Sequence, residues 1–301
     1  MSKFNIDDTR CAPTKEYKDG SCFEYDSLVK IASSFNNKYR NNQIKISKDK
    51  NELVKAIESK LKRECDDQTC WLKQNFTREI LDESMKNTFR PKGPTKKNAW
   101  LSTSDIDKVM EQYHEKYHNF MYLGTVPSDF ERIPILNFRD MNFDSILKSG
   151  KSKLGMVINL DEHTEGGSHW VALYIDLKKN IVYFFDSFGK KPIRNIKKFI
   201  NRVVKYMYKK IFGTNMPIKY LDKALKKYER LSKPVQEALK KVDIRFNTIQ
   251  HQKANTECGV YSINFILRIL KGDSFDEIVN NPVSDNEMEE CREKYFSNYT
   301  I

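Results

Sequence analysis

The chain has 301 residues, of which 39% are hydrophobic and 31% are charged, and its formal net charge is +12. No apolar stretch approaches the roughly 18 residues that a membrane helix needs, and residues 1–8 lack the apolar core of a signal peptide. We therefore expect a protein that neither spans a membrane nor is secreted by that route, with one large domain or two small ones.

The cysteines are too sparse for the disulfide framework of a small secreted domain, so we expect reduced thiols. The spacings from Cys11 to Cys22 and from Cys65 to Cys70 are not the tight pairs of a zinc site. We interpret these four residues as buried thiols, or as members of one long-range pair, and we predict no metal. The remaining cysteines are Cys258 and Cys291.

The N-terminal part of the chain has the pattern of a small helical unit. Apolar residues at helical spacing predict a helix over 26–39, and alternation over 43–47 predicts a short strand. Asp49 is placed to cap a second helix.

The segment 90–97, rich in Pro, Gly and Lys, is a predicted linker. It divides the chain into a mainly helical N-terminal extension, 1–90, and a second domain, 91–301. The order of elements in the second domain predicts an α+β fold, in which helices pack on a small sheet. The predicted elements are a helix capped by Ser104, strands over 154–160, 169–176 and 181–185, helices over 193–212 and 219–242, a strand over 244–249, a helix from Thr256, and two short helices with capping boxes at Ser274 with Glu277 and at Ser284 with Glu287.

Four residues in this domain together predict a thiol-protease site. Cys258 lies in the first turn of a predicted helix, where the helix dipole and free amides favour a thiolate. His169 opens a predicted strand and is the candidate base. Asp186 ends another strand and would orient the imidazole, and Gln252 would donate its amide to a developing oxyanion beside the Cys258 N–H.

Each of these residues also has a simpler interpretation. A single buried cysteine or histidine is usually structural, Asp186 could begin a turn with Ser187, and Gln252 could pair with a sheet edge. The functional interpretation depends on all four occurring in suitable local contexts.

With these residues the chain resembles the SUMO-specific (ubiquitin-like) proteases and the adenovirus protease. His169 with Trp170 resembles the His-Trp pair of that group, and Gln252 with Cys258 and Gly259 resembles its Gln-x5-Cys-Gly motif. Asp186 follows an aromatic strand, as in the SUMO proteases. Trp100-Leu101 resembles a Trp-Leu element whose tryptophan covers the substrate's diglycine. The similarity spans residues 98–270.

The resemblance implies a papain-like peptidase fold and a preference for glycine before the cut. Trp100 and Trp170 would roof a narrow channel in which Gly-Gly-x or Gly-x-Gly sequences fit. Gly259 would let the substrate backbone approach closely. No metal or organic cofactor is implied.

Residues 1–90, with Cys11-Ala12-Pro13 and Cys70-Trp71-Leu72, resemble the N-terminal extension of proteases from large DNA viruses. This resemblance implies cleavage of capsid or core precursors during virion maturation, in the virion and the host cytoplasm. The oligomeric state stays open.

Basic residues are concentrated between Lys190 and Lys241. Such a stripe can attract nucleic acid electrostatically, but we favour solvated amphipathic helices.

Another motif, His114-Glu115-Lys116-Tyr117-His118, matches the His-Glu-x-x-His helix of zinc proteases. Its polar flanking residues predict a surface helix without a metal. We assign no catalytic role to His163 or His251.

Two alternatives to a precursor-processing endopeptidase stay open. The first is an isopeptidase of the same fold that removes ubiquitin or SUMO. The second is a binding protein, either an inactive protease fold or a basic nucleic-acid-binding module.

Overall fold

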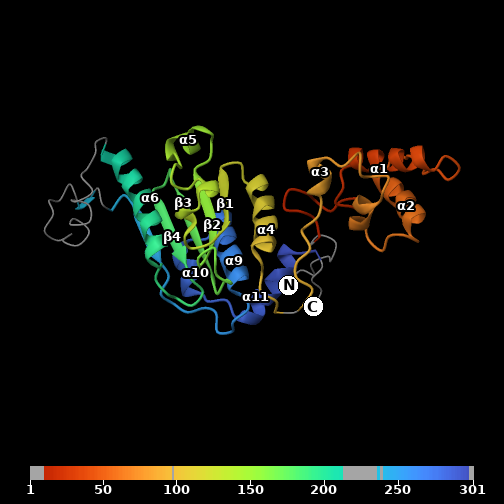
Figure 1. Ribbon diagram of the computed structural model, residues 1–301. Coiled ribbons are helices and arrows are strands. Elements are labelled where there is room, and N and C mark those ends of the chain that lie inside the picture. Colours follow the sequence, from red (N-terminus) through yellow and green to blue (C-terminus); the bar gives the residue numbers. More distant parts are fainter. Residues whose placement is uncertain (1–9, 97, 213–235, 238–239, 298–301) are drawn as a thin grey trace. The chain divides into compact units, whose positions relative to one another are not determined.

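The computed structural model describes residues 10–96, 98–212, 236–237 and 240–297 (Figure 1). The predicted helix 219–242 and the middle of the basic stripe lie mostly outside these residues. The chain divides into two compact units, Met1–Gly93 with Glu293–Ile301, and Pro94–Arg292. In the described ranges, no helix is long and apolar enough to cross a membrane.

The first unit is built from short helices around an aromatic core. Phe23 stacks on Trp71 and meets Phe89 edge to face, and the inner faces of the helices supply Leu28, Ile31 and other buried apolar residues. The helices are α1 (Tyr25–Lys38), α2 (Lys50–Leu61), η1 (Gln68–Lys73) and α3 (Glu83–Lys86). Asp49 caps α2, as predicted.

The predicted strand over 43–47 is wrong, because this segment has no regular structure. The side-chain amide of Asn36 donates to the Ile44 carbonyl and accepts from the Ile44 N–H. One side chain therefore takes the place of a partner strand.

The expectation of reduced thiols in this unit is also wrong. Cys11 is bonded to Cys22, and Cys65 to Cys70, with 5.4 Å between the Cα atoms of each pair. Both pairs are local, whereas the sequence favoured free thiols or one long-range pair. Cys258 and Cys291 are buried and form no disulfide bond.

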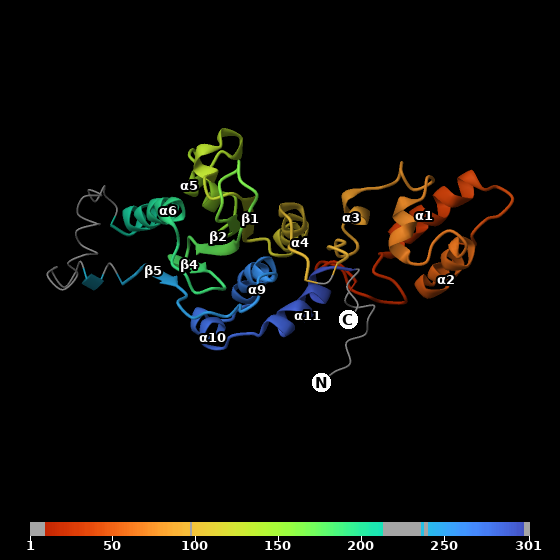
Figure 2. The same ribbon diagram turned by 60° about the horizontal axis from the view of Figure 1, so that its bottom comes forward.

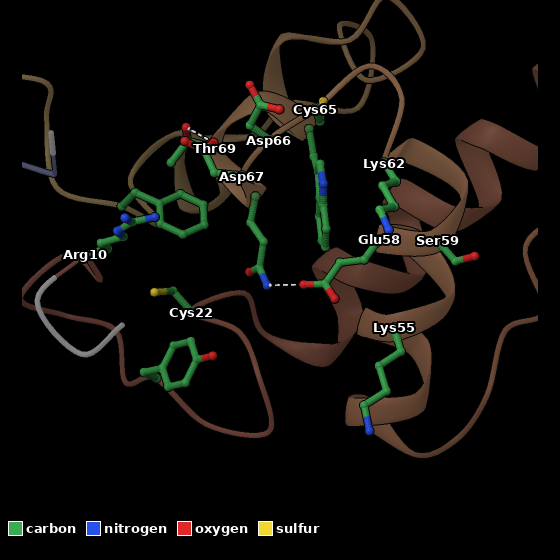
Figure 3. Close-up of a pocket in the computed structure, with 14 residues that line it drawn as sticks. Arg10, Cys22, Lys55, Glu58, Ser59, Lys62, Cys65, Asp66, Asp67 and Thr69 are labelled. Atoms are coloured by element: carbon green, nitrogen blue, oxygen red, sulfur yellow. Dashed lines mark hydrogen bonds between the residues drawn. The ribbon is translucent and has the colours of Figure 1, made fainter. Parts of the chain in front are cut away.

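A cavity of about 670 Å³ opens within this unit (Figure 3). One wall comes from α2, through Lys55, Glu58 and Lys62, and Cys22 and Cys65 contribute one residue from each disulfide. Acidic and basic side chains lie together in its lining, so its charge selects no obvious ligand.

The second unit contains a five-stranded sheet in the order β1-β2-β3-β4-β5. The inner strands are antiparallel to one another, whereas β1 pairs parallel with β2 and β5 parallel with β4. The strands are β1 (Phe120–Val126), β2 (Lys153–Asn159), β3 (Trp170–Asp176), β4 (Ile181–Phe185) and β5 (Asp243–Phe246). The predicted β3–β4 hairpin is confirmed, with Asn180 in the left-handed conformation at its turn.

Helices cover both faces of this sheet (Figure 2). One face packs Leu154, Leu173 and Phe184 against α6. The other face packs against α9, where Phe185 stacks on Phe265. Gly155 lies where a Cβ would come within 2.8 Å of the Phe120 ring, so the close packing of β1 and α9 on β2 requires glycine there.

The remaining helices follow the chain order α4 (Thr103–Lys116), η2 (Phe130–Arg132), η3 (Pro134–Leu136), α5 (Phe143–Lys148), α6 (Arg194–Phe212), α9 (Cys258–Lys271), α10 (Phe275–Asn280) and α11 (Asp285–Tyr295).

Two details of the second unit differ from the sequence predictions. The cap of α4 is Ser102 and not Ser104, because Asp105 lies three residues after Ser102 and completes a capping box. Strand β1 was not predicted, because its sequence shows no clean alternation. The α+β fold class itself is confirmed.

Candidate active site

The β3–β4 hairpin brings His169 and Asp186 together. His169 directly precedes β3 and Asp186 directly follows β4. Because the strands are antiparallel, with Ala172 opposite Phe185, both residues lie at the same end of the hairpin. Nε2 of His169 lies 2.7 Å from Oδ1 of Asp186, and both side chains are buried.

The position of Asp186 is fixed by its neighbours. Its Oδ1 also accepts the backbone N–H of Phe188, at 2.8 Å. Its own backbone N–H donates to Oδ1 of Asn247, and its carbonyl accepts from Nδ2 of the same residue. The Phe188 ring stacks on the His169 imidazole with centroids 4.6 Å apart. The imidazole is therefore held at one edge and on one face.

The third group at the imidazole is Cys258. Burial alone would lower the pKa of His169, but hydrogen bonds to Asp186 and Cys258 and their charges raise that pKa to about 9. Because Nε2 binds Asp186, Nδ1 is the ring nitrogen that remains for the thiol. A pKa of about 9 makes the imidazolium the main form at neutral pH.

Cys258 is the first residue of α9, and Glu257 is the N-cap. The Glu257 side chain does not cap the helix. The first N–H groups of a helix have no partner inside it, so the N–H of Cys258 points out of the helix start beside its own thiol.

The side chain of Gln252 is fully buried. Its Oε1 accepts from the Ser187 hydroxyl at 2.7 Å, and its Nε2 donates to the Ala254 carbonyl at 2.7 Å. An amide NH₂ group carries two hydrogens, so one N–H is left for a further acceptor.

The segment 100–101, which we call the tryptophan segment, lies against the start of α9. Nε1 of Trp170 donates to the Leu101 carbonyl at 2.9 Å. Trp100 is 47% exposed, which leaves much of its ring available for contact. A Cβ on Gly259 would come within 3.1 Å of Leu101. The close approach that the structure shows at Gly259 is thus with Leu101, and its proposed approach by a substrate stays a prediction.

Sequence reasoning missed Ser187, Phe188 and Asn247 as parts of this arrangement. Ser187 and Phe188 had a local signal, because they directly follow Asp186. Asn247 lies far along the chain and had none.

The His-Glu-x-x-His match does not form a shared helical face. His114 lies in α4, but the helix ends at Lys116, before His118. Among the described residues, no group of three or more His, Cys, Asp or Glu side chains could hold a metal ion.

The other two histidines, His163 and His251, have partners away from the candidate site of His169, Asp186, Gln252 and Cys258. Nδ1 of His163 lies 2.7 Å from Asp129. Nε2 of His251 lies 3.1 Å from the Val279 carbonyl, away from the Gln252 side-chain partners.

Several cations of the basic stripe are exposed on the described part of α6 and just before it, and binding of nucleic acid there stays a prediction. They are Lys190, Lys191, Arg194, Lys197, Lys198 and Lys209.

Comparison with known proteins supports the same chemistry. Residues 151–301 match the Ulp1 protease family, C-terminal catalytic domain. The chain is 32% identical to a thiol protease of Acanthamoeba polyphaga mimivirus, over 96% of this chain and 93% of that one. It is 24% identical to the SUMO-1 cysteine protease of African swine fever virus, over 81% and 88% of the two chains.

The crystal structure of the African swine fever virus protease superposes with a TM-score of 0.65 at 21% identity, covering 95% of each chain, and so shares this fold. The chain belongs to the Ulp1 protease family, and it is a cysteine protease. At the level of family and enzyme class, the predictions of a thiol protease and of a viral protease related to the ubiquitin-like proteases are confirmed.

Proposed function

We propose that this protein is an endopeptidase that cleaves after glycine, with Cys258 as nucleophile and His169 as general acid and base. The observation that carries the proposal is the buried chain of contacts from Asp186 through His169 to Cys258 at the start of α9. Asp186 orients the imidazole, and Gln252 helps to bind the oxyanion.

The reaction begins when the Cys258 sulfur attacks the scissile carbonyl carbon. The C=O electron pair moves to oxygen, where the Cys258 N–H and the second N–H of Gln252 stabilise the negative charge. As the carbonyl re-forms and the C–N bond breaks, the His169 imidazolium gives its Nδ1 proton to the leaving amine. A thioester remains on Cys258.

Water completes the reaction. Neutral His169 takes a proton from the water molecule that attacks the thioester, a second oxyanion forms in the same place, and the carboxylic acid leaves as the sulfur is released. No step requires a metal or an organic cofactor.

Preference for glycine would come from the two tryptophans. Nε1 of Trp170 donates to the Leu101 carbonyl, and Trp100, which directly precedes Leu101, is about half exposed. Indole rings over the residues before the cut would clash with any side chain larger than hydrogen. We therefore expect Gly-Gly-x or Gly-x-Gly substrates.

The natural substrates that we propose are capsid or core precursors of a large DNA virus, cleaved during virion maturation in the virion and the host cytoplasm. The support is the likeness to a viral thiol protease over nearly the whole chain, N-terminal unit included. An isopeptidase acting on SUMO is the second candidate, because the African swine fever virus relative is named a SUMO-1 cysteine protease.

The first test is cleavage of a peptide library containing Gly-Gly-x and Gly-x-Gly sequences, with Cys258→Ala as the inactive variant. Cys291→Ala is the matched control, because Cys291 is the other buried cysteine that forms no disulfide bond. We expect cleavage after glycine by the wild type and by Cys291→Ala. Turnover of whole SUMO conjugates without turnover of peptides would favour the isopeptidase, and cleavage by Cys258→Ala would reject the assigned nucleophile.

A further inference from the structure

Arg292, in α11, is completely buried in the second unit, and its guanidinium binds two segments of that unit at once. Nε and Nη2 donate to the two carboxylate oxygens of Glu257, at 2.8 and 2.9 Å. Nη2 also donates to the Ala99 carbonyl, at 2.7 Å. One planar group therefore makes a bidentate ion pair on one side and a backbone contact on the other.

The two residues that it binds are the immediate neighbours of site residues. Glu257 directly precedes Cys258, and Ala99 directly precedes Trp100. The start of α9 and the tryptophan segment are far apart in the sequence, and Arg292 holds them at a fixed separation.

This arrangement is costly if stability is its only purpose. A buried ion pair loses the hydration of both charges, and a well-packed apolar replacement is often as stable. Glu289 adds to the cost, because it brings a second carboxylate to the same buried guanidinium, 2.8 Å from its Nε, and next to Glu257. Burial raises the pKa of Glu257, and Glu289 adds to that rise, while Arg292 opposes it.

The geometry also leaves the start of α9 open. Glu257 is the N-cap, and negative charge is favoured near the free N–H groups at the start of a helix. Here the side chain binds Arg292 and does not cap the helix. Arg292 thus holds Glu257 away from the amides that would face an oxyanion, and its charge offsets a carboxylate one residue from the thiol.

We propose that Arg292 is a positioning residue, which sets the distance between the start of α9 at Cys258 and the tryptophan segment. That distance in turn sets the width of the glycine channel. The inference rests on the proposed function for its link to glycine, but the positioning of the thiol can be measured without a substrate.

The experiment compares Arg292→Lys with Arg292→Met and with the double variant Glu257→Met/Arg292→Met. Lysine keeps the charge but has no planar fork, so it cannot reproduce the bidentate pair together with the Ala99 contact. Arg292→Met leaves both Glu257 and Glu289 without their partner, whereas the double variant leaves only Glu289, so the double variant should fold even if Arg292→Met does not. Arg268→Lys is the matched control, because Arg268 pairs with Asp273 at the other end of α9.

Two readouts separate the inference from the proposed function. The first is the rate at which iodoacetamide alkylates Cys258, followed by peptide mapping so that Cys291 is not counted. The second is the ratio of kcat/KM for glycine and alanine peptides. We expect alkylation and glycine-peptide kcat/KM to fall roughly tenfold or more in Arg292→Lys and the double variant, with a smaller glycine-to-alanine ratio, and no change in Arg268→Lys.

Wild-type alkylation rates in folded Arg292→Lys and in the double variant would overturn the positioning role. If the wild type cleaves no glycine peptide, the proposed function fails, but the alkylation rates still decide whether Arg292 positions the thiol. Slower alkylation of Cys258 in the Arg292 variants than in the wild type, with an unchanged glycine-to-alanine ratio of kcat/KM, would overturn the link to channel width.

Discussion

The hydroxyl of Ser187 donates to Oε1 of Gln252, and this contact fixes which end of the buried amide faces which neighbour. Nε2 must then point toward the Ala254 carbonyl, where it donates. Asp186 and Ser187 are adjacent, so a single turn after β4 orients both the histidine and the proposed oxyanion donor.

Ser187→Ala should therefore weaken oxyanion binding without touching the nucleophile. We expect kcat to fall by roughly tenfold with little change in KM, and Gln252→Ala to cost more, on the order of 10²–10³. Steady-state kinetics on one glycine peptide would check this order. A larger loss in Ser187→Ala than in Gln252→Ala would show that the hydroxyl has another role.

The high pKa of His169 predicts the pH range of activity. The imidazolium must donate a proton to the leaving amine, so kcat/KM should hold up to pH about 9 and decline above it. Asp186→Asn removes the main group that raises this pKa, so its decline should start at lower pH. A pH–rate profile of both proteins is the measurement, and coincident alkaline limbs would contradict the assignment.

The same group couples protonation to folding. The pKa of His169 is higher in the folded protein, about 9, than the 6.5 of an ordinary histidine. The folded state therefore binds more protons between these values, and the stabilisation is complete below pH 6.5 and is lost as the pH rises through 9. The melting temperature of the wild type should fall over this range relative to His169→Asn, and parallel curves would refute the coupling.

The two disulfides should stabilise the N-terminal unit unequally. Cys11–Cys22 closes a loop with a sequence separation of 11, and Cys65–Cys70 one of 5. A loop of about 15 residues is worth about 3 kcal/mol in the chain-entropy account, and a shorter one less. Hydrogen exchange in α1 should therefore rise more in Cys11→Ser/Cys22→Ser than in Cys65→Ser/Cys70→Ser. The reverse order would show that loop closure is not the main contribution.

Trp170→Phe keeps an aromatic ring but leaves the buried Leu101 carbonyl without its donor. The loss of that partner should cost about 1–3 kcal/mol and loosen the tryptophan segment, so alanine peptides should compete better with glycine peptides. Trp71→Phe, in the core of the other unit, should lower stability without changing this selectivity. The ratio of kcat/KM values for the two peptides decides between them.

The sequence predicted those parts of the site that depend on local pattern. His169, Asp186 and Cys258 each stand at the end of an element with a clear period, so the ends of β3, β4 and α9 could be placed and their chemistry inferred. Sequence patterns did not predict long-range partners. Asn247 makes two hydrogen bonds to the backbone of Asp186, and Arg292 binds Glu257. Both come from distant segments in which no local sequence pattern indicates the contact.

The misplaced elements have a similar cause. The short strand predicted over 43–47 failed because Asn36 satisfies the backbone of Ile44 from a neighbouring helix. The disulfides were missed because two cysteines at ordinary spacing carry no sign of how the chain folds back between them.

Two residues near the end of the chain, Phe296 and Ser297, pack on the segment 91–93 of the N-terminal unit. Phe296 is 1% exposed, its ring would lie within 2.6 Å of a Cβ on Gly93, and the Ser297 N–H donates to the Pro91 carbonyl. A shortened protease that starts at Pro94 would carry an orphaned phenylalanine on its tail. Poor solubility of such a fragment would then reflect the loss of the segment on which Phe296 packs. Lost turnover by the fragment would therefore not show that residues 1–90 recruit the substrate.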